Sequence, residues 1–185
     1  MRKVQYLLIM LPMVLGISCS HKYNAEVQDL NFYQWNLWQD TGADPEVKLP
    51  TVGWEELHRG KGKLVRIPAS IEEHFPDSQG AGVYWYHCRF TIPEQWEERP
   101  ISLVFEEAGP ILNVFLNEQE VGSFQAEQDA FEQDVSESIY YIRDNHLSIR
   151  VVCSEGLKPG KLSGITGTIL VIPGIMEKEE LEETE

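Results

Sequence analysis

Apolar residues alternate with polar ones over many short segments of the chain, and turn-forming residues separate these segments. The clearest case is residues 83–92, where Tyr86, Cys88, Phe90 and Ile92 recur at every second position. A period of two is typical of half-buried β-strands. Helical turns are predicted only at residues 93–97 and 137–142, because no stretch with the helical period exceeds two turns. The predicted strands span residues 31–38, 63–67, 83–92, 101–106, 111–116, 121–124, 131–135, 147–153 and 168–172.

Short strands at a spacing of roughly ten residues, with polar turns between them, predict an all-β fold, either a β-sandwich or a jelly roll. Asn117, Glu118 and Gln119 separate two strands and predict a hairpin connection, since Asn tolerates the left-handed conformation. The chain has 185 residues, so one folded domain is expected. We predict a signal peptide at residues 1–18, a polar tether at 19–29, the sandwich at 30–173 and an acidic tail at 174–185.

The first twenty residues predict export and lipid anchoring. Arg2 and Lys3 precede an apolar run at residues 6–17 that is too short to span a membrane and is typical of a signal peptide. The run ends in LGISC at residues 15–19, which resembles a bacterial lipobox, although Gly16 stands where Leu is usual. This resemblance implies acylation of Cys19 and membrane anchoring by several acyl chains. Because Ser20 follows, we expect the outer membrane; an ordinary signal peptide with an incidental cysteine is the alternative.

The net charge argues against nucleic acid as a ligand, and the cysteines argue against a zinc site. A formal net charge of −15 argues against nucleic acid as a partner, because phosphate backbones require clusters of Lys and Arg. Cys88 and Cys153 both lie in predicted strands, either as buried free thiols or as a disulfide that export would permit. We find neither the Cys/His spacing of a zinc site nor an EF-hand loop, so we predict no metal and no cofactor.

Seven segments follow one another in an order that is typical of a known family: RIPAS at 66–70, GVYWYHCRFTIP at 82–93, LVFE at 103–106, VFLNEQEVG at 114–122, FEQDV at 131–135, LSIRV at 147–151 and GITGTILV at 164–171. Together they resemble the N-terminal sugar-binding domain of glycoside hydrolase family 2, a galactose-binding-like jelly roll. The resemblance covers about residues 30–173 and implies the same fold and a carbohydrate ligand.

The same resemblance does not imply catalysis. Enzymes of that family cut glycosides on a (β/α)₈ barrel, which needs roughly 250 residues, more than remain after residues 1–18. The two catalytic glutamates of the family have no counterpart here. Glu55–Glu56 and Glu106–Glu107 are adjacent in sequence, and neighbours in a strand point to opposite faces, so neither is an attractive acid–base pair. His58, His74, His87 and His146 accompany no recognisable nucleophile motif.

A sugar site requires an aromatic platform beside hydrogen-bonding side chains. Trp54 is the best candidate for such a platform among the five tryptophans, and polar residues follow it in the sequence. The predicted ligand-binding residues are Trp54, His58, Arg59, Glu72 and Asp77.

Three hypotheses follow. The leading one is a non-catalytic carbohydrate-binding or accessory lipoprotein with a glycan or oligosaccharide as its partner. The second is a protein-interaction module that docks on a separate glycoside hydrolase, which predicts a contiguous apolar surface patch. The third is a glycosidase subunit, although the missing barrel argues against it.

Overall fold

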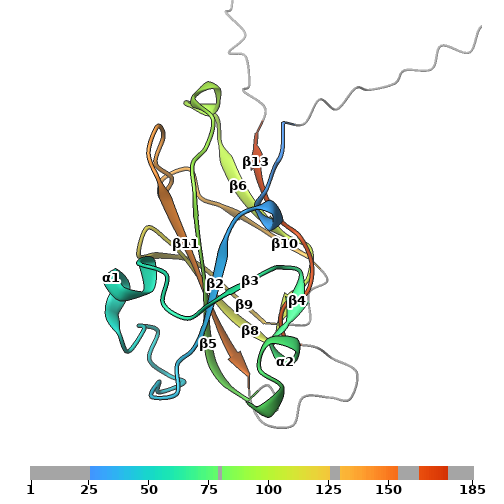
Figure 1. The fold of residues 1–185 in the computed structure, drawn as a ribbon. Helices are drawn as coiled ribbons and strands as arrows, with labels where there is room; N and C mark the ends of the chain where they lie inside the picture. The colour runs from blue at the N-terminus through green and yellow to red at the C-terminus, as the bar shows by residue number, and fades with distance from the viewer. Residues whose placement is uncertain (1–25, 79–80, 126–129, 154–162, 175–185) are drawn as a thin grey trace, which may run out of the picture.

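Antiparallel β-sheets form the framework of the computed structural model, which describes residues 26–78, 81–125, 130–153 and 163–174 (Figure 1). The strands are β1 (Gln28–Asp29), β2 (Trp35–Gln39), β3 (Lys63–Val65), β4 (Ala69–Ser70), β5 (Gly82–Phe90), β6 (Ile101–Phe105), β7 (Ala108–Gly109), β8 (Ile111–Leu116), β9 (Gln119–Gln125), β10 (Phe131–Asp134), β11 (Asn145–Cys153), β12 (Gly164–Ile165) and β13 (Ile169–Pro173). The helices are α1 (Gly53–His58) and α2 (Ile71–His74), with 3₁₀ turns η1 (Leu30–Phe32), η2 (Pro76–Ser78) and η3 (Glu94–Trp96).

Two sheets face each other, and a small third sheet closes one side. The six-stranded sheet has the order β3-β2-β5-β11-β8-β9, the four-stranded sheet β1-β13-β6-β10, and the three-stranded sheet β4-β12-β7. Every pairing of the described strands is antiparallel. The predicted all-β sandwich is confirmed.

The main core lies between the six-stranded and four-stranded sheets, because strand alternation sends every second side chain inward. On β5 the inward residues are Tyr84, Tyr86, Cys88 and Phe90, all buried. Leu103 of β6 is also fully buried in this cluster. The alternation read from residues 83–92 therefore identified the inward face of the longest strand correctly.

The predicted hairpin joins β8 and β9 through a two-residue turn. Asn117 and Glu118 both have positive φ, 53° and 73°, the conformation that a tight hairpin requires. The Asn117 amide also donates to the carbonyl of Ser138 at 2.8 Å and to Oδ1 of Asn145 at 2.9 Å. The turn is thereby tied to the buried start of β11.

The outward face of the six-stranded sheet is also covered, and α1 covers it on the side away from β13, β6 and β10 (Figure 1). A second, smaller apolar cluster forms there from the buried side chains of Leu57, Val83, Trp85 and Phe115, with the partly buried Trp54 packed against it. Alternation alone does not predict this cover, because α1 has only six residues. The sequence pattern missed both α1 and α2.

The predicted helical turns and terminal segments have different outcomes in the structure. The helical turn predicted at residues 93–97 is confirmed as η3. The one predicted at 137–142 is not helical, and residues 136–138 form an ordinary turn there. Gln28 and Asp29, assigned to the tether, pair with β13. Residues 1–25, with the predicted signal peptide and Cys19, lie outside the described residues, as do residues 175–185 of the acidic tail. No helix of the described ranges is long and apolar enough to cross a membrane.

Cys88 and Cys153 are free, buried thiols rather than a disulfide. Cys88 pairs across the sheet with Leu147, whereas Cys153 pairs with Gly82 at the far end of the same two strands. Burial raises the pKa of the Cys88 thiol to about 12 and that of Cys153 to about 11, so both stay protonated at neutral pH.

Candidate functional site

Three histidines from separate elements meet on the outward face of the six-stranded sheet. His87 lies on β5 opposite Ser148, and His146 lies on β11 opposite Arg89, so the two histidines are diagonal neighbours on one face. His58 is the last residue of α1 and completes the group from above the sheet. The three rings therefore come together only through strand pairing and the docking of α1.

The position of His58 depends on how α1 is held. The Trp54 ring packs on Trp85 at 5.6 Å between centroids and on Phe115 at 5.1 Å. Gly60, the second residue after the helix, has φ 93°, and its amide donates to the carbonyl of Leu57 at 3.1 Å. A left-handed residue just after a helix is a role for which glycine is strongly preferred. These contacts fix the last turn, and with it His58, over the sheet.

The three imidazole rings are close and nearly parallel. The His58 centroid lies 4.2 Å from that of His146 and 5.0 Å from that of His87, with interplanar angles of 19° and 25°. Nε2 of His87 lies 3.0 Å from Nδ1 of His146. Nitrogen atoms from all three rings lie within 4.8 Å of one another. Such a group of nitrogen donors could hold a metal ion.

Burial keeps these rings neutral at physiological pH. It lowers the pKa of His58 to about 4, with a further contribution from His146. It lowers the pKa of His87 to about 3, and the nearby His58, His146 and Arg89 act in the same direction. The pKa of His146 is also lowered, again mainly by burial. Each ring therefore offers an unprotonated nitrogen near pH 7.

A pocket of about 580 Å³ opens beside the cluster, and His58 and His87 form part of its wall. Most of its lining side chains carry hydrogen-bonding groups. Arg59 is held by ion pairs to Glu55 and Glu56 of α1. The lining residues are Gln34, Asn36, His58, Arg59, Gly60, Gly62, Leu64, His87 and Arg89. This surface suits a polar ligand with many hydroxyl groups.

The structure brings together three of the five predicted ligand-binding residues. Trp54, His58 and Arg59 lie on or directly after α1, but Trp54 packs into the outer apolar cluster and is not an open shelf. Glu72 instead accepts hydrogen bonds from Ser163, at 2.7 Å from its hydroxyl. Asp77 lines a different pocket of about 430 Å³.

Glu72 has a structural role in the described fold. Burial, the largest single influence, acts to raise its pKa, but the hydrogen bonds from Ser163, Ser70 and its own backbone amide together outweigh that effect and the pKa is lowered. The ionised carboxylate thus joins α2 to residue 163, just before β12.

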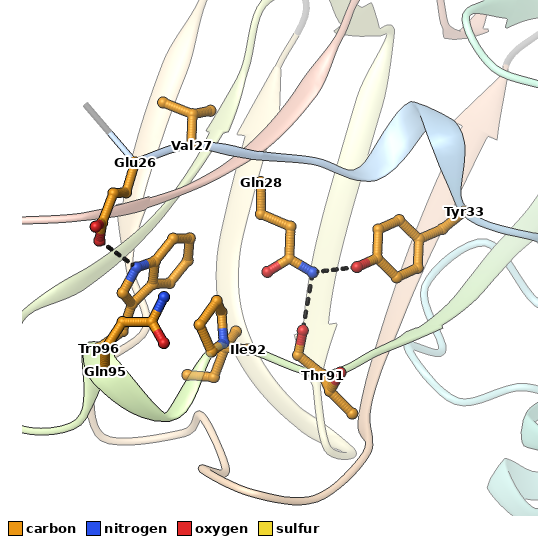
Figure 2. Close-up of a pocket in the computed structure, with 9 residues that line it drawn as sticks. Glu26, Val27, Gln28, Tyr33, Thr91, Ile92, Gln95 and Trp96 are labelled. Atoms are coloured by element: carbon orange, nitrogen blue, oxygen red, sulfur yellow. Dashed lines mark hydrogen bonds between the residues drawn. The ribbon is translucent and has the colours of Figure 1, made fainter. Parts of the chain in front are cut away.

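Figure 2 shows a second pocket, of about 570 Å³, between residues 26–33 and residues 91–96. Its polar groups serve the fold: the Gln28 amide donates to the Tyr33 hydroxyl and to the Thr91 carbonyl. The Trp96 indole donates to the Glu26 carboxylate at 2.8 Å. Because these groups brace the N-terminal segment against η3, we place the candidate site at the histidine-lined pocket instead.

His87 and His146 were missed as functional residues because their meeting depends on strand register. One signal was present: His87 lies in phase with Trp85 and out of phase with the core residues of β5, so its outward orientation follows from the alternation. The docking of His58 had no comparable signal, since α1 itself was not predicted.

Comparisons with known proteins agree with this fold. Residues 65–156 match the model of a family described as the β-galactosidase second all-β domain. A glycosyl hydrolase family 2 member from Bacteroides cellulosilyticus superposes with a TM-score of 0.63 at 18% identity, over 80% of this chain and 20% of that one.

Two β-glucuronidases give similar results. The enzyme from Lactobacillus rhamnosus has a TM-score of 0.63 at 21% identity, over 79% of this chain and 28% of its own. The enzyme from an uncultured Clostridium has a TM-score of 0.62 at 18% identity, over 89% of this chain and 30% of its own. The present chain thus spans between 20% and 30% of these proteins.

The chain therefore has the all-β sandwich fold found in these glycosyl hydrolase family 2 and β-glucuronidase structures. The matched model describes a second all-β domain, whereas the sequence segments pointed to the N-terminal sugar-binding domain. That finer assignment stays a prediction.

The lowered histidine pKa values predict how stability depends on pH. In chelator-treated protein, the free energy of unfolding should fall as the pH drops from the ordinary histidine pKa of 6.5 towards 4, the value for His58. In this window the unfolded chain binds protons that His58 and His87 of the folded chain do not, which favours unfolding. His87→Gln should flatten this dependence, as measured by urea unfolding at several pH values. Identical pH slopes for the two proteins would contradict the burial of His87.

Proposed function

We propose that this protein is a non-catalytic, carbohydrate-binding accessory module of the cell envelope, which binds an oligosaccharide in the histidine-lined pocket. The observation that carries the proposal is the pocket itself, about 580 Å³ in volume and walled mainly by hydrogen-bonding side chains. Its volume lies within the range of about 300–1,000 Å³ that is usual for small-ligand sites.

The chemistry of the pocket matches a sugar. Arg59, Asn36 and Gln34 present donors and acceptors for hydroxyl groups. The imidazole rings of His58 and His87 add flat faces of the kind on which the C–H face of a sugar packs. The relatives named above are glycosyl hydrolases and β-glucuronidases, which supports a glycan as the class of ligand.

The arrangement favours binding over hydrolysis. Glu55 and Glu56, adjacent exposed carboxylates of α1, both pair with Arg59, which lines the pocket. They are therefore held by a cation instead of sharing a proton as an acid–base pair does. The third hypothesis, a glycosidase subunit, would be supported by turnover of an aryl glycoside by the purified protein.

Docking on a separate glycoside hydrolase is the alternative function. Two exposed apolar side chains, Phe32 at 88% and Leu64 at 65% exposure, would supply apolar contacts to such a partner, and Leu64 also lines the histidine-lined pocket. Docking on a separate hydrolase also agrees with the short length that this chain matches in a related enzyme, 20% of the family 2 member from Bacteroides cellulosilyticus. Co-migration with a purified family 2 hydrolase in size-exclusion chromatography, without retardation by any glycan, would favour it over the proposal.

Arg59→Ala should weaken glycan binding by roughly tenfold or more, because a charged donor to a sugar hydroxyl is lost. The Arg59 side chain is 64% exposed, so its ion pairs add little to stability and the variant should stay folded. Affinity electrophoresis in gels that contain neutral or uronate-bearing polysaccharides, with EDTA present, measures the change.

The matched control is Arg143→Ala, which removes an arginine that lies over the Tyr140 ring, apart from the pocket. This variant should migrate like the wild type. Absence of retardation by every polysaccharide, or an equal effect of the two arginine variants, would contradict the proposed site.

Lipid anchoring is a separate part of the proposal and rests on the lipobox-like run at residues 15–19. Cys19→Ser should abolish incorporation of a labelled fatty acid, because the acylated side chain is lost. Metabolic labelling with a radioactive fatty acid, followed by fractionation, measures this. A labelled Cys19→Ser protein that stays in the membrane fraction would rule out Cys19 as the anchor.

A further inference from the structure

The histidine cluster has features that glycan binding does not require. Its three donors come from α1, β5 and β11, three elements far apart in the sequence, and their nitrogen atoms converge within 4.8 Å. His21 lies outside the described residues, and His74 lies on α2. Three of the four described histidines thus gather at one place in a chain that has five in all.

One donor of the cluster lacks a partner. His87 is only 3% exposed, and its Nδ1 atom is buried without a hydrogen-bond partner among the described residues. An unpaired buried polar atom carries a desolvation cost of about 1–3 kcal/mol that folds usually avoid. A metal ion removes this cost only if the His87 ring turns until Nδ1 points at the ion, in place of the Nε2 atom that faces His146 at 3.0 Å.

We propose that His58, His87 and His146 bind one divalent transition-metal ion of the zinc class. Three imidazole ligands with a fourth, exchangeable position are a recurrent arrangement for zinc. Here the fourth position would open to the pocket, since His58 and His87 line it. Binding requires the nearly parallel rings to turn about their side-chain torsions until one lone pair from each points at the ion.

The charged and polar side chains around the three histidines favour binding of a cation. The Glu118 carboxylate lies 3.8 Å from Nδ1 of His58, and the Ser148 hydroxyl lies 3.4 Å from its Nε2. If Nε2 of His58 turns from Ser148 to the ion, its Nδ1–H can donate to Glu118, and such a carboxylate partner orients a metal-bound histidine and increases its basicity. Arg89 brings an opposing positive charge, but Asp144 pairs with it at 3.5 Å.

Neutral imidazole is the form that binds metal, and burial already holds the pKa of each of these rings below its ordinary value. The inference rests on the cluster alone and is independent of whether a glycan binds. Stacked histidines that serve only as aromatic packing are the competing explanation, and the experiment separates the two.

The test is a titration of the full-length, tag-free protein, purified in detergent and stripped with EDTA. Zn²⁺ binding is followed by calorimetry, and Co²⁺ binding by the visible absorption that reports nitrogen ligation and low coordination number. We expect one ion per chain. Loss of even an outer partner of a metal ligand costs about 10–100-fold in affinity, so His87→Gln and His146→Gln should each weaken binding by at least that much.

His74→Gln is the control, because it removes a partly buried histidine outside the cluster and should leave the affinity unchanged. Far-ultraviolet circular dichroism checks that each variant keeps its β-sheet signal. Should a strand variant unfold, His58→Gln replaces it, since His58 lies at the end of α1. Absence of binding at one equivalent, or equal affinities in the cluster and control variants, overturns the proposal.

Discussion

Aromatic packing between α1 and the outward face of the six-stranded sheet determines where the candidate site lies. A sandwich needs only one apolar face per sheet, yet here Trp85 and Phe115 add a second apolar surface on the opposite side. Water contact with that surface is unfavourable, and Trp54 and Leu57 remove it by packing against it. Since His58 is the last residue of the same helix, the burial that holds α1 also positions the third histidine.

A polar anchor acts together with this packing. Arg150 of β11 is only 2% exposed, and its guanidinium donates to Oδ1 of Asn113 and to the backbone carbonyls of Asp44 and Pro45. It thereby fastens the segment that precedes α1 to the sheet. A buried arginine needs such partners, because its charge cannot be left without hydrogen bonds in the interior. Apolar and polar contacts therefore hold the same segment on the same face.

The sequence predicted the sheets better than the site. Alternation over residues 83–92 and the turn-forming Asn117 depend on local chemistry, and both predictions agree with the structure. The meeting of His87 and His146 depends on the register between β5 and β11, which local patterns do not encode. The six residues of α1 make fewer than two helical turns, which is too few for the helical period to be recognised in the sequence. The helix and the position of His58 are therefore known only from the structure.

On the outward face α1 is docked by aromatic contacts, and a pocket and the three histidines lie where this helix ends. A double-mutant cycle with Trp54→Ala and Phe115→Ala, read from urea unfolding, tests that docking most directly. The rings lie 5.1 Å apart, so we predict a favourable coupling energy of about 0.5–1.5 kcal/mol. Strictly additive effects of the two substitutions would contradict the docking of α1 and, with it, the assembly of the site.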